Sequence, residues 1–317
     1  MAVAARVKPG TYFAPDDWAK VSRRSSWIGL ALVAHCWAVI IAAGALFVIW
    51  PNPLTFVVAV VLIGARQLGL AVLMHDAAHG ALHPNQKVND WVGQWLCGAP
   101  TNGDVYRYRK YHLQHHKYAQ QEEDPDLGLS APFPITKASF RRKAVRDLTG
   151  QTFYKQRIKP TFGAFGNGAP FAKTFKAVMG FWSPFLIVSA LAIAVLIPMG
   201  LWWAWFALWL VPMATWFPLV TRLRSIAEHA LIDKNEPDPL HHARTTHANW
   251  FERAILAPYY VNYHCEHHMF MHVPCWNLPR AHRLLKKNGV TDKMLIEPGG
   301  YAKVLALTTG KEMAAAA

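Results

Sequence analysis

Three short clusters of histidine supply most of the side chains in this sequence that could carry out chemistry. They occupy residues 75–79, 112–116 and 264–268, which read HDAAH, HLQHH and HCEHH. Residues three and four apart share one face of a helix, so each cluster can direct two or three imidazoles toward a common centre. A single pair with this spacing is usually surface chemistry, but three such clusters are hard to obtain by accident. The pattern predicts a metal site.

The number of histidines indicates more than one ion. A catalytic zinc ion needs only three protein ligands, whereas the three clusters together hold eight histidines. We therefore expect two ions. Imidazole binds iron, copper and zinc alike, so the ligand type leaves the metal open. The HExxH arrangement of metalloproteases does not occur in the sequence.

Four long apolar stretches must position these clusters. They cover residues 27–50, 54–74, 179–197 and 201–220, in a chain of 317 residues that is 53% hydrophobic. The first stretch is uncharged throughout and would be about 36 Å long as a helix, enough to cross a bilayer. A soluble protein with buried core helices is the alternative, but such a core seldom needs so long an uncharged run. The sequence predicts an all-α integral membrane fold with four transmembrane helices.

Very short connectors join these stretches into two hairpins, and the charges orient them. The formal net charge is +14, and every lysine and arginine except Arg66 lies outside the four stretches. Because cytoplasmic loops are enriched in basic residues, both chain ends and all three clusters are expected on the cytoplasmic side. Arg66 is expected either to snorkel to the boundary or to be paired inside the bundle. No basic helix or aromatic-basic module indicates nucleic acid as a partner.

The stretches divide one membrane domain, residues 1–317, into five parts. These are a cytoplasmic N-terminal segment (1–26), a first hairpin (27–74), a cytoplasmic loop with two clusters (75–177), a second hairpin (179–220) and a cytoplasmic C-terminal region with the third cluster (221–317). Four scattered cysteines fit a reducing compartment better than a disulfide framework. We expect the cytoplasmic parts to form a helical cap that holds the metals.

In order and spacing, the clusters resemble the three histidine boxes of the membrane-bound fatty acid desaturases and related hydroxylases. The two hairpins are similar to that family, and the segment NYHCEHHMFMHVPCWNLPRAHRLL resembles the family's third box together with its C-terminal flank. The resemblance implies a site with two Fe2+ ions. It also implies nine ligands, of which the ninth lies in the segment RLRSIAEHA: His75, His79, His112, His115, His116, His229, His264, His267 and His268.

Acidic residues near the clusters are candidates for orienting the ligands. A metal-bound histidine normally donates its second N–H to a carboxylate or carbonyl. The candidates for this role are Asp76, Asp124, Asp126, Glu228 and Glu266. A further hypothesis concerns the segment HHARTTHANW at 241–250, where Arg244 and the threonines could position a polar head group.

The resemblance implies an oxidoreductase that acts on paired donors with reduction of O2. The expected reaction introduces a double bond into a fatty acyl chain or related lipid, with no catalytic residue beyond the metal ligands. No fused cytochrome b5 is recognised, so we expect a separate electron donor of the ferredoxin or cytochrome b5 type. The protein is expected to be a multi-pass membrane protein in contact with membrane lipid.

Two other functions stay open at this point. A hydroxylase or ketolase acting on a lipid, carotenoid or alkane would use the same site, because nothing in these residues separates loss of a second hydrogen from insertion of oxygen. A non-catalytic membrane metal-binding protein would need polar groups within the spans. Apart from Arg66, Gln67 and His35, the apolar stretches lack them.

Overall fold

The computed structural model describes residues 6–310 and is helical almost throughout. Four of its helical regions are long and apolar enough to cross a membrane: Ile28–Ile49, Pro53–Ala78, Phe171–Met199 and Trp202–His229. The first two regions are helices α2 and α3, and the third begins with α10 (Phe171–Leu196). The predicted all-α fold with four membrane-spanning helices is confirmed.

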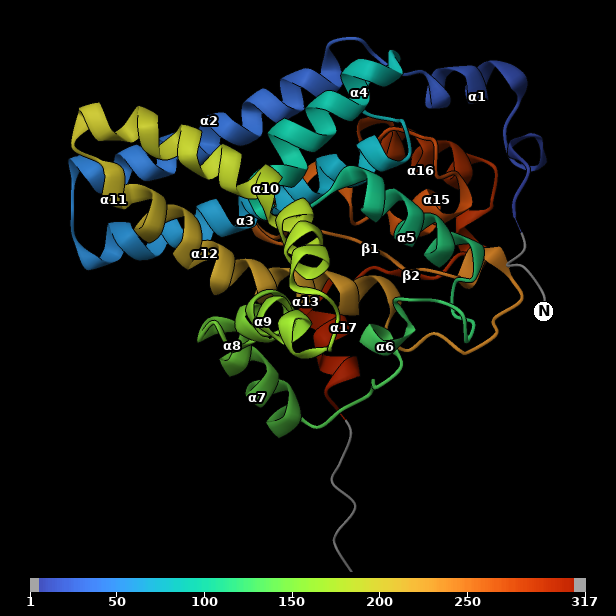
Figure 1. Cartoon of the computed structure of the whole chain (residues 1–317). Coiled ribbons are helices and arrows are strands. Elements are labelled where there is room, and N and C mark those ends of the chain that lie inside the picture. Colours follow the sequence, from blue (N-terminus) through green and yellow to red (C-terminus); the bar gives the residue numbers. More distant parts are fainter. Residues whose placement is uncertain (1–5, 311–317) are drawn as a thin grey trace, which may run out of the picture.

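The first hairpin is closed by a capped turn. The side chain of Asn52 accepts hydrogen bonds from the backbone N–H groups of Leu54 and Thr55, which satisfies donors left free at the start of α3. α2 and α3 then run side by side, and their turn lies at the same end of the molecule as the turn between α10 and α11 (Trp202–Ala204) (Figure 1). The two hairpins therefore form one bundle with a common turn end.

The fourth span is not one regular helix. A π-helical turn, Trp205–Leu210, follows α11, and two α-helical pieces, α12 (Val211–Ala214) and α13 (Trp216–His229), complete the span. Pro212 has no N–H to donate, and Thr215 leaves ideal helical geometry at φ −119° and ψ −73°. The fourth span is therefore interrupted near Thr215 before α13 continues to His229.

Three spans extend beyond their apolar stretches. The second continues from 74 to Ala78, the fourth from 220 to His229, and the third already begins at Phe171. The apolar composition of a stretch reflects its contact with lipid. A helix can continue beyond that stretch into polar residues, because its backbone hydrogen bonds form there as well. The extensions bring His75 and His229 onto the ends of spanning helices.

Arg66 is paired inside the bundle. Its side chain is only 7% exposed, its guanidinium donates to the carbonyl of Ala254, and it lies 5.7 Å from the centre of the Tyr259 ring. Of the two expectations for this residue, snorkelling is wrong, because α14 (Trp250–Ile255) and the following turn cover this part of α3.

Short helices gather at the end of the bundle opposite the turns (Figure 1). They are α1 (Pro15–Ser22), α4 (Gln86–Val92), α5 (Val105–Lys117), α6 (Leu127–Ser130), α7 (Lys137–Leu148), α8 (Gln151–Phe153), α9 (Lys159–Gly163), α14 (Trp250–Ile255), α15 (His264–Met269), α16 (Leu278–Lys287) and α17 (Gly300–Thr308). The N-terminal segment is fastened to this layer: the rings of Phe13 and Phe270 lie 5.1 Å apart, and Asn277 donates to the carbonyl of Val21.

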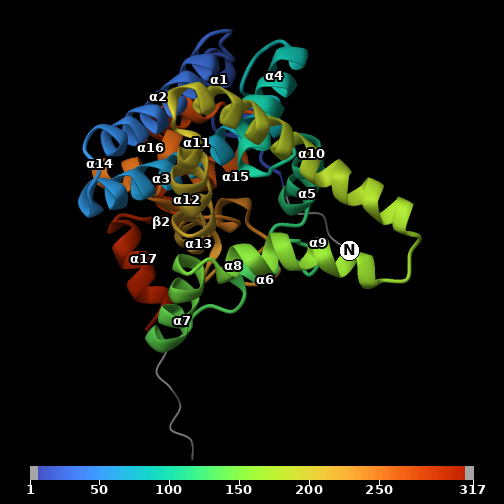
Figure 2. The ribbon, with the colours of Figure 1, turned by 60° about the vertical axis from the view of Figure 1, so that its left-hand side comes forward.

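Two short strands and a projecting arm complete the fold. β1 (Thr245–Thr246) pairs in parallel with β2 (Ile296–Glu297), and Thr245 also bridges to Tyr263, immediately before α15. α9 and the first turns of α10 extend together away from the other helices (Figure 2). Residues 245 and 296 thus hold the C-terminal region against the third histidine cluster.

Candidate metal centre

The three clusters and the ninth histidine lie on the ends of four helices. His75 occupies the last turn of α3, and His79 is the residue that ends it. The second cluster lies on the C-terminal half of α5, the third forms most of α15, and His229 is the last residue of α13. Helical spacing therefore sets each cluster on one face, as predicted, and the fold decides which faces meet.

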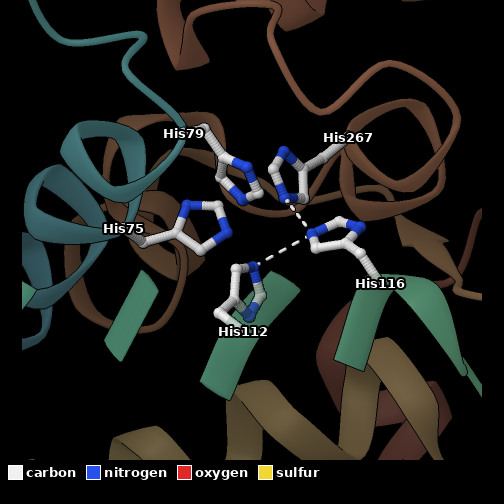
Figure 3. A group of neighbouring side chains, drawn as sticks. All are labelled: His75, His79, His112, His116 and His267. Carbon is white, nitrogen blue, oxygen red and sulfur yellow. Dashed lines mark hydrogen bonds between the residues drawn. The ribbon is translucent and has the colours of Figure 1, made fainter. Parts of the chain in front are cut away.

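Five histidines from three helices form the first group. His75, His79, His112, His116 and His267 each offer a ring nitrogen, and these nitrogens all lie within 4.8 Å of one another (Figure 3). The Nε2 atom of His116 is 3.0 Å from that of His112 and 3.0 Å from that of His267. The rings point inward at one space, which is the arrangement of ligands around a single ion.

A second group adjoins the first. His115, His229 and His268 bring their ring nitrogens within 4.8 Å of one another, and His229 also belongs to a cluster with His264 and Glu228. The Nε2 atoms of His229 and His264 are 2.9 Å apart, and those of His115 and His268 are 3.3 Å apart. The nine histidines that the sequence singled out thus divide into groups of five and four.

The two groups are neighbours, and their free nitrogens are suited to metal. The rings of His116 and His268, one from each group, have centres 4.3 Å apart. Both ring nitrogens of His75 and of His79 are buried without a hydrogen-bond partner among the described residues. Buried polar groups are normally paired. The unpaired ring nitrogens of His75 and His79 are therefore suited to binding a metal cation.

Burial keeps most of these imidazoles neutral. It lowers the pKa below the ordinary histidine value for six ligands that lie beyond the spanning helices: His79, His112, His116, His264, His267 and His268. A histidine must be unprotonated to bind a metal, so these side chains are in the ligating form at neutral pH.

His115 is the exception, because it has a carboxylate partner. Burial opposes its protonation, but the hydrogen bond and the charge of Asp124 outweigh burial, and the pKa of His115 is raised. The His115 Nδ1–H donates to Asp124 Oδ1 over 2.7 Å, which leaves Nε2 directed at the second group. Asp124 therefore fixes the orientation of the His115 ring, and its role toward a metal stays a prediction.

Two other acidic candidates lie close by but contact a ligand less directly. Asp126 Oδ2 is 3.8 Å from His115 Nδ1, and the Asp126 carboxylate accepts a hydrogen bond from the Tyr111 hydroxyl. Asp76 accepts the backbone N–H of Cys275 at 2.8 Å, while its other oxygen is 3.7 Å from His75 Nδ1. Asp76 thus ties α3 to the segment after the third cluster.

The two glutamates have different surroundings from those expected. Glu266 accepts hydrogen bonds from His282 and Thr245, so it joins the C-terminal region instead of orienting a ligand. Glu228 has its Oε2 atom 3.5 Å from His264 Nε2, inside the ligand group itself, and 2.9 Å from the guanidinium of Arg224. Glu228 is therefore placed as a candidate ligand of the second group.

One aromatic residue at the site was not expected from the sequence. The ring of Tyr108 stacks on that of His112, with centres 5.1 Å apart and planes 10° from parallel. The only sequence signal is its position four residues before His112, one helical turn away on the same face. The stacking fixes the plane of a ligand ring.

The polar side chains of the segment at 241–250, which was expected to bind a head group, form hydrogen bonds with other residues of the protein instead. Arg244 is 8% exposed and donates to the carbonyls of Ala227 and Ala230. Thr245 donates to Glu266, and Thr246 lies within donor distance of the Ala227 carbonyl. These contacts hold α13 against the third cluster, and the head-group hypothesis for Arg244 is wrong.

A large apolar hollow lies among the spanning helices. Its volume is about 980 Å3, and it is lined by residues of α2, α10 and the 205–210 turn, including Trp37, Trp205 and Trp209. Trp209 stacks on both other tryptophans, at ring distances of 5.4 and 5.3 Å. Its indole N–H donates to the Pro100 carbonyl. The lining contains none of the nine histidines.

Comparison with known families agrees with this geometry. Residues 51–294 match the family described as fatty acid desaturase. The match spans most of the sequence and includes all nine histidines, so the chain belongs to the fatty acid desaturase family.

Similar proteins include desaturases and ketolases. The chain is 29% identical to dihydrorhizobitoxine desaturase of Bradyrhizobium elkanii, with 90% of this chain and 80% of the relative covered. It is 24% identical to beta-carotene ketolase of Paracoccus sp. (strain PC1), over 80% of this chain and 90% of the relative. It is 26% identical to sn-1 oleoyl-lipid 12-desaturase of Arthrospira platensis, over 71% and 67% respectively. The protein is an oxidoreductase of this membrane-bound family.

Proposed function

We propose that the protein is an O2-dependent di-iron desaturase that introduces a double bond into an aliphatic chain. The observation that carries the proposal is the division of nine histidines, eight of them buried and His268 half-buried, into adjoining groups of five and four. Two Fe2+ ions fit this donor set, because imidazole suits iron and a pair of neighbouring ions can share one substrate. When bound, the iron pair would supply the oxidising power for C–H cleavage by reducing O2.

The residues of this chain would position the reaction and protect it. Asp124 fixes the ring of His115, and Tyr108 fixes that of His112. All of the proposed ligands except His268 are at most 6% exposed, so bulk water is kept from the centre. Exclusion of water limits side reactions of an oxidising site.

Desaturation is the preferred outcome, and ketolation or hydroxylation is the second. Two of the three relatives named above are desaturases, and one is a beta-carotene ketolase that this chain matches over 90% of the relative's length. All of these reactions begin with removal of hydrogen from carbon. They differ in whether a second hydrogen is lost or oxygen is added.

The partners follow from the fold and from the family. An acyl lipid is the proposed substrate class, electrons would come from a separate ferredoxin or cytochrome b5 type protein, and membrane lipid surrounds the spans. The apolar hollow supports the presence of a lipid chain, since it is lined almost wholly by hydrocarbon and indole surface. Residues 1–317 would form one domain with both termini and the metal centre on the cytoplasmic side.

The test joins metal analysis to product analysis. Purified protein is expected to hold two irons per chain, and cells that express it are expected to form an acyl species lighter by two hydrogens in an O2-dependent manner. A product heavier by one oxygen would favour the hydroxylase. The variant His268→Ala is expected to enter the membrane normally and to lose activity. One zinc per chain with an unchanged lipid profile would overturn the proposal.

A further inference from the structure

A second and smaller cavity lies beside α13, outside the histidine groups. Its volume is about 270 Å3, and it is enclosed by α12 and α13 on one side and by residues 152–157 on the other. The lining mixes apolar side chains, such as Phe153 and Phe217, with hydroxyl groups and two arginines. A cavity of this kind suits a molecule with an apolar body and one polar end.

Arg157 lies in the wall of this cavity, and no acidic side chain among the described residues neutralises its positive charge. Its guanidinium makes one hydrogen bond, to the carbonyl of Asn102 over 3.3 Å, and among the described residues it takes part in no ion pair. Arg222, which also lines the cavity, is instead held by Asp147 through two bonds of 2.6 and 2.9 Å. Burial lowers the pKa of Arg157, which is the effect of removing a cation from water without supplying an anion.

The cavity also contains a buried donor without a partner. The hydroxyl of Thr221 is inaccessible to solvent and makes no hydrogen bond among the described residues. Buried hydroxyl groups are normally satisfied. In the wall of one cavity, Thr221 thus lacks a hydrogen-bond partner and Arg157 lacks an anionic one among the described residues.

Part of the wall of this cavity and the candidate ligand His229 belong to the same helix, α13. Ser225 lines its wall and precedes the ligand His229 by four residues, which is about 6 Å along the α13 axis. Arg222 precedes His229 by seven residues, about 10 Å. One helix thus connects the cavity wall with the metal centre over a short distance.

We propose that this cavity binds the carboxylate of a small substrate, with Arg157 as the anchoring cation and Thr221 as a second donor. The proposal rests on the proposed function, since it names the substrate class of the same site. A guanidinium matches a carboxylate with paired, charge-assisted hydrogen bonds. The volume corresponds to about nine water-sized groups, so a compact carboxylate fits and a nucleotide-bearing carrier does not.

Binding of octanoate, compared with its neutral analogue octanamide, tests this directly. The purified full chain in lipid nanodiscs, without added metal, is titrated calorimetrically with each probe. We expect octanoate to bind at least tenfold more tightly than octanamide, because a hydrogen bond to a charged group contributes about 1.5–3 kcal/mol, roughly 10- to 100-fold in affinity. Arg157→Gln is expected to remove the preference and to leave octanamide binding unchanged.

Two further variants separate anchoring from general effects of charge. Arg142→Gln removes an exposed cation from α7 and is expected to keep the preference for octanoate. Thr221→Val is expected to weaken octanoate binding roughly 10- to 100-fold, because the hydroxyl would donate its hydrogen bond to a charged carboxylate. Arg222 is left intact, because its removal would strand the buried Asp147 carboxylate.

The possible outcomes distinguish this site from the proposed reaction. Equal affinity for the two probes in the unmodified protein, or an unchanged preference in Arg157→Gln, would overturn the carboxylate site. Tighter binding of octyl phosphate than of octanoate would overturn it in favour of a phosphate. A clear octanoate preference in a protein that never oxidises lipid would uphold the site and refute the proposed reaction.

Discussion

At the scale of single residues, Asp124 offers the sharpest test of how the ligands are oriented. Its carboxylate accepts a hydrogen bond of 2.7 Å from the Nδ1–H group of His115. Loss of such a partner typically reduces metal affinity 10- to 100-fold. We therefore expect Asp124→Asn to lower iron affinity by about that factor, in a competitive chelator titration.

The matched control is Asp126→Asn, two residues away. Asp126 is 3.8 Å from the same nitrogen and is bonded to Tyr111, so its replacement is expected to change iron affinity little. Helical content by circular dichroism should be the same in both variants. Equal losses of iron in the two variants would contradict a specific role for Asp124.

Sequence spacing indicates which histidines of a cluster share a face, but it does not indicate the partners of their neighbours. The helical intervals within residues 112–116 and 264–268 are enough to place those rings on common faces. Glu228 and Glu266 each lie next to a ligand in the sequence, yet one points into the metal group and the other toward His282. Adjacent residues on a helix point about 100° apart, so the neighbouring helix decides which partner each one meets.

At the scale of helices, a close approach between α3 and the 93–98 turn sets the position of the first cluster. A Cβ atom added at Gly93 would lie 2.4 Å from the Cβ of Ala77, which stands between His75 and His79 on α3. Real side chains do not approach so closely, so only glycine fits here.

Gly93→Ala is expected to displace the end of α3 and to destabilise the protein by about 1–3 kcal/mol, the usual cost of overpacking. Thermal unfolding in detergent measures the change, and iron retention reports on the displaced histidines. Gly163→Ala on α9 is the control, since nothing lies within 4 Å of its added Cβ. A Gly93→Ala protein as stable as the control would show that the helices can separate without cost.

The sequence indicates the existence of the spans better than their ends. Apolar runs identify four membrane helices because the bilayer demands about 20 apolar residues from each. The π-helical turn at Trp205–Leu210 and the extension of α13 to His229 leave no comparable pattern, because they depend on packing between helices. Arg66 illustrates the same limit, since its partner Ala254 is 188 residues away.

At the scale of the whole molecule, the hairpin turns lie at one end of the bundle (Figure 1). Helices α5 and α15, which carry the second and third histidine clusters and are called the histidine layer here, lie toward the other end. The excess of basic residues outside the spans predicts that the histidine layer faces the cytoplasm. Labelling with a membrane-impermeant thiol reagent tests this orientation, and the four native cysteines are buried, so the background is low.

We expect Met199→Cys, at the turn of the second hairpin, to be labelled in intact cells. Lys110→Cys, on the outer face of α5, is expected to react only after lysis. Both native side chains are exposed, which makes the two sites comparable. The reverse pattern of labelling would invert the orientation.

The contact between His116 and His267 also has a consequence for biosynthesis. The two residues are 151 positions apart, and synthesis of that length takes roughly 8–30 s at about 5–20 residues per second. Throughout this interval the nascent chain carries the first two clusters without the third. The proposed metal centre can therefore be completed only after the second hairpin has been synthesised and α15 has left the ribosome.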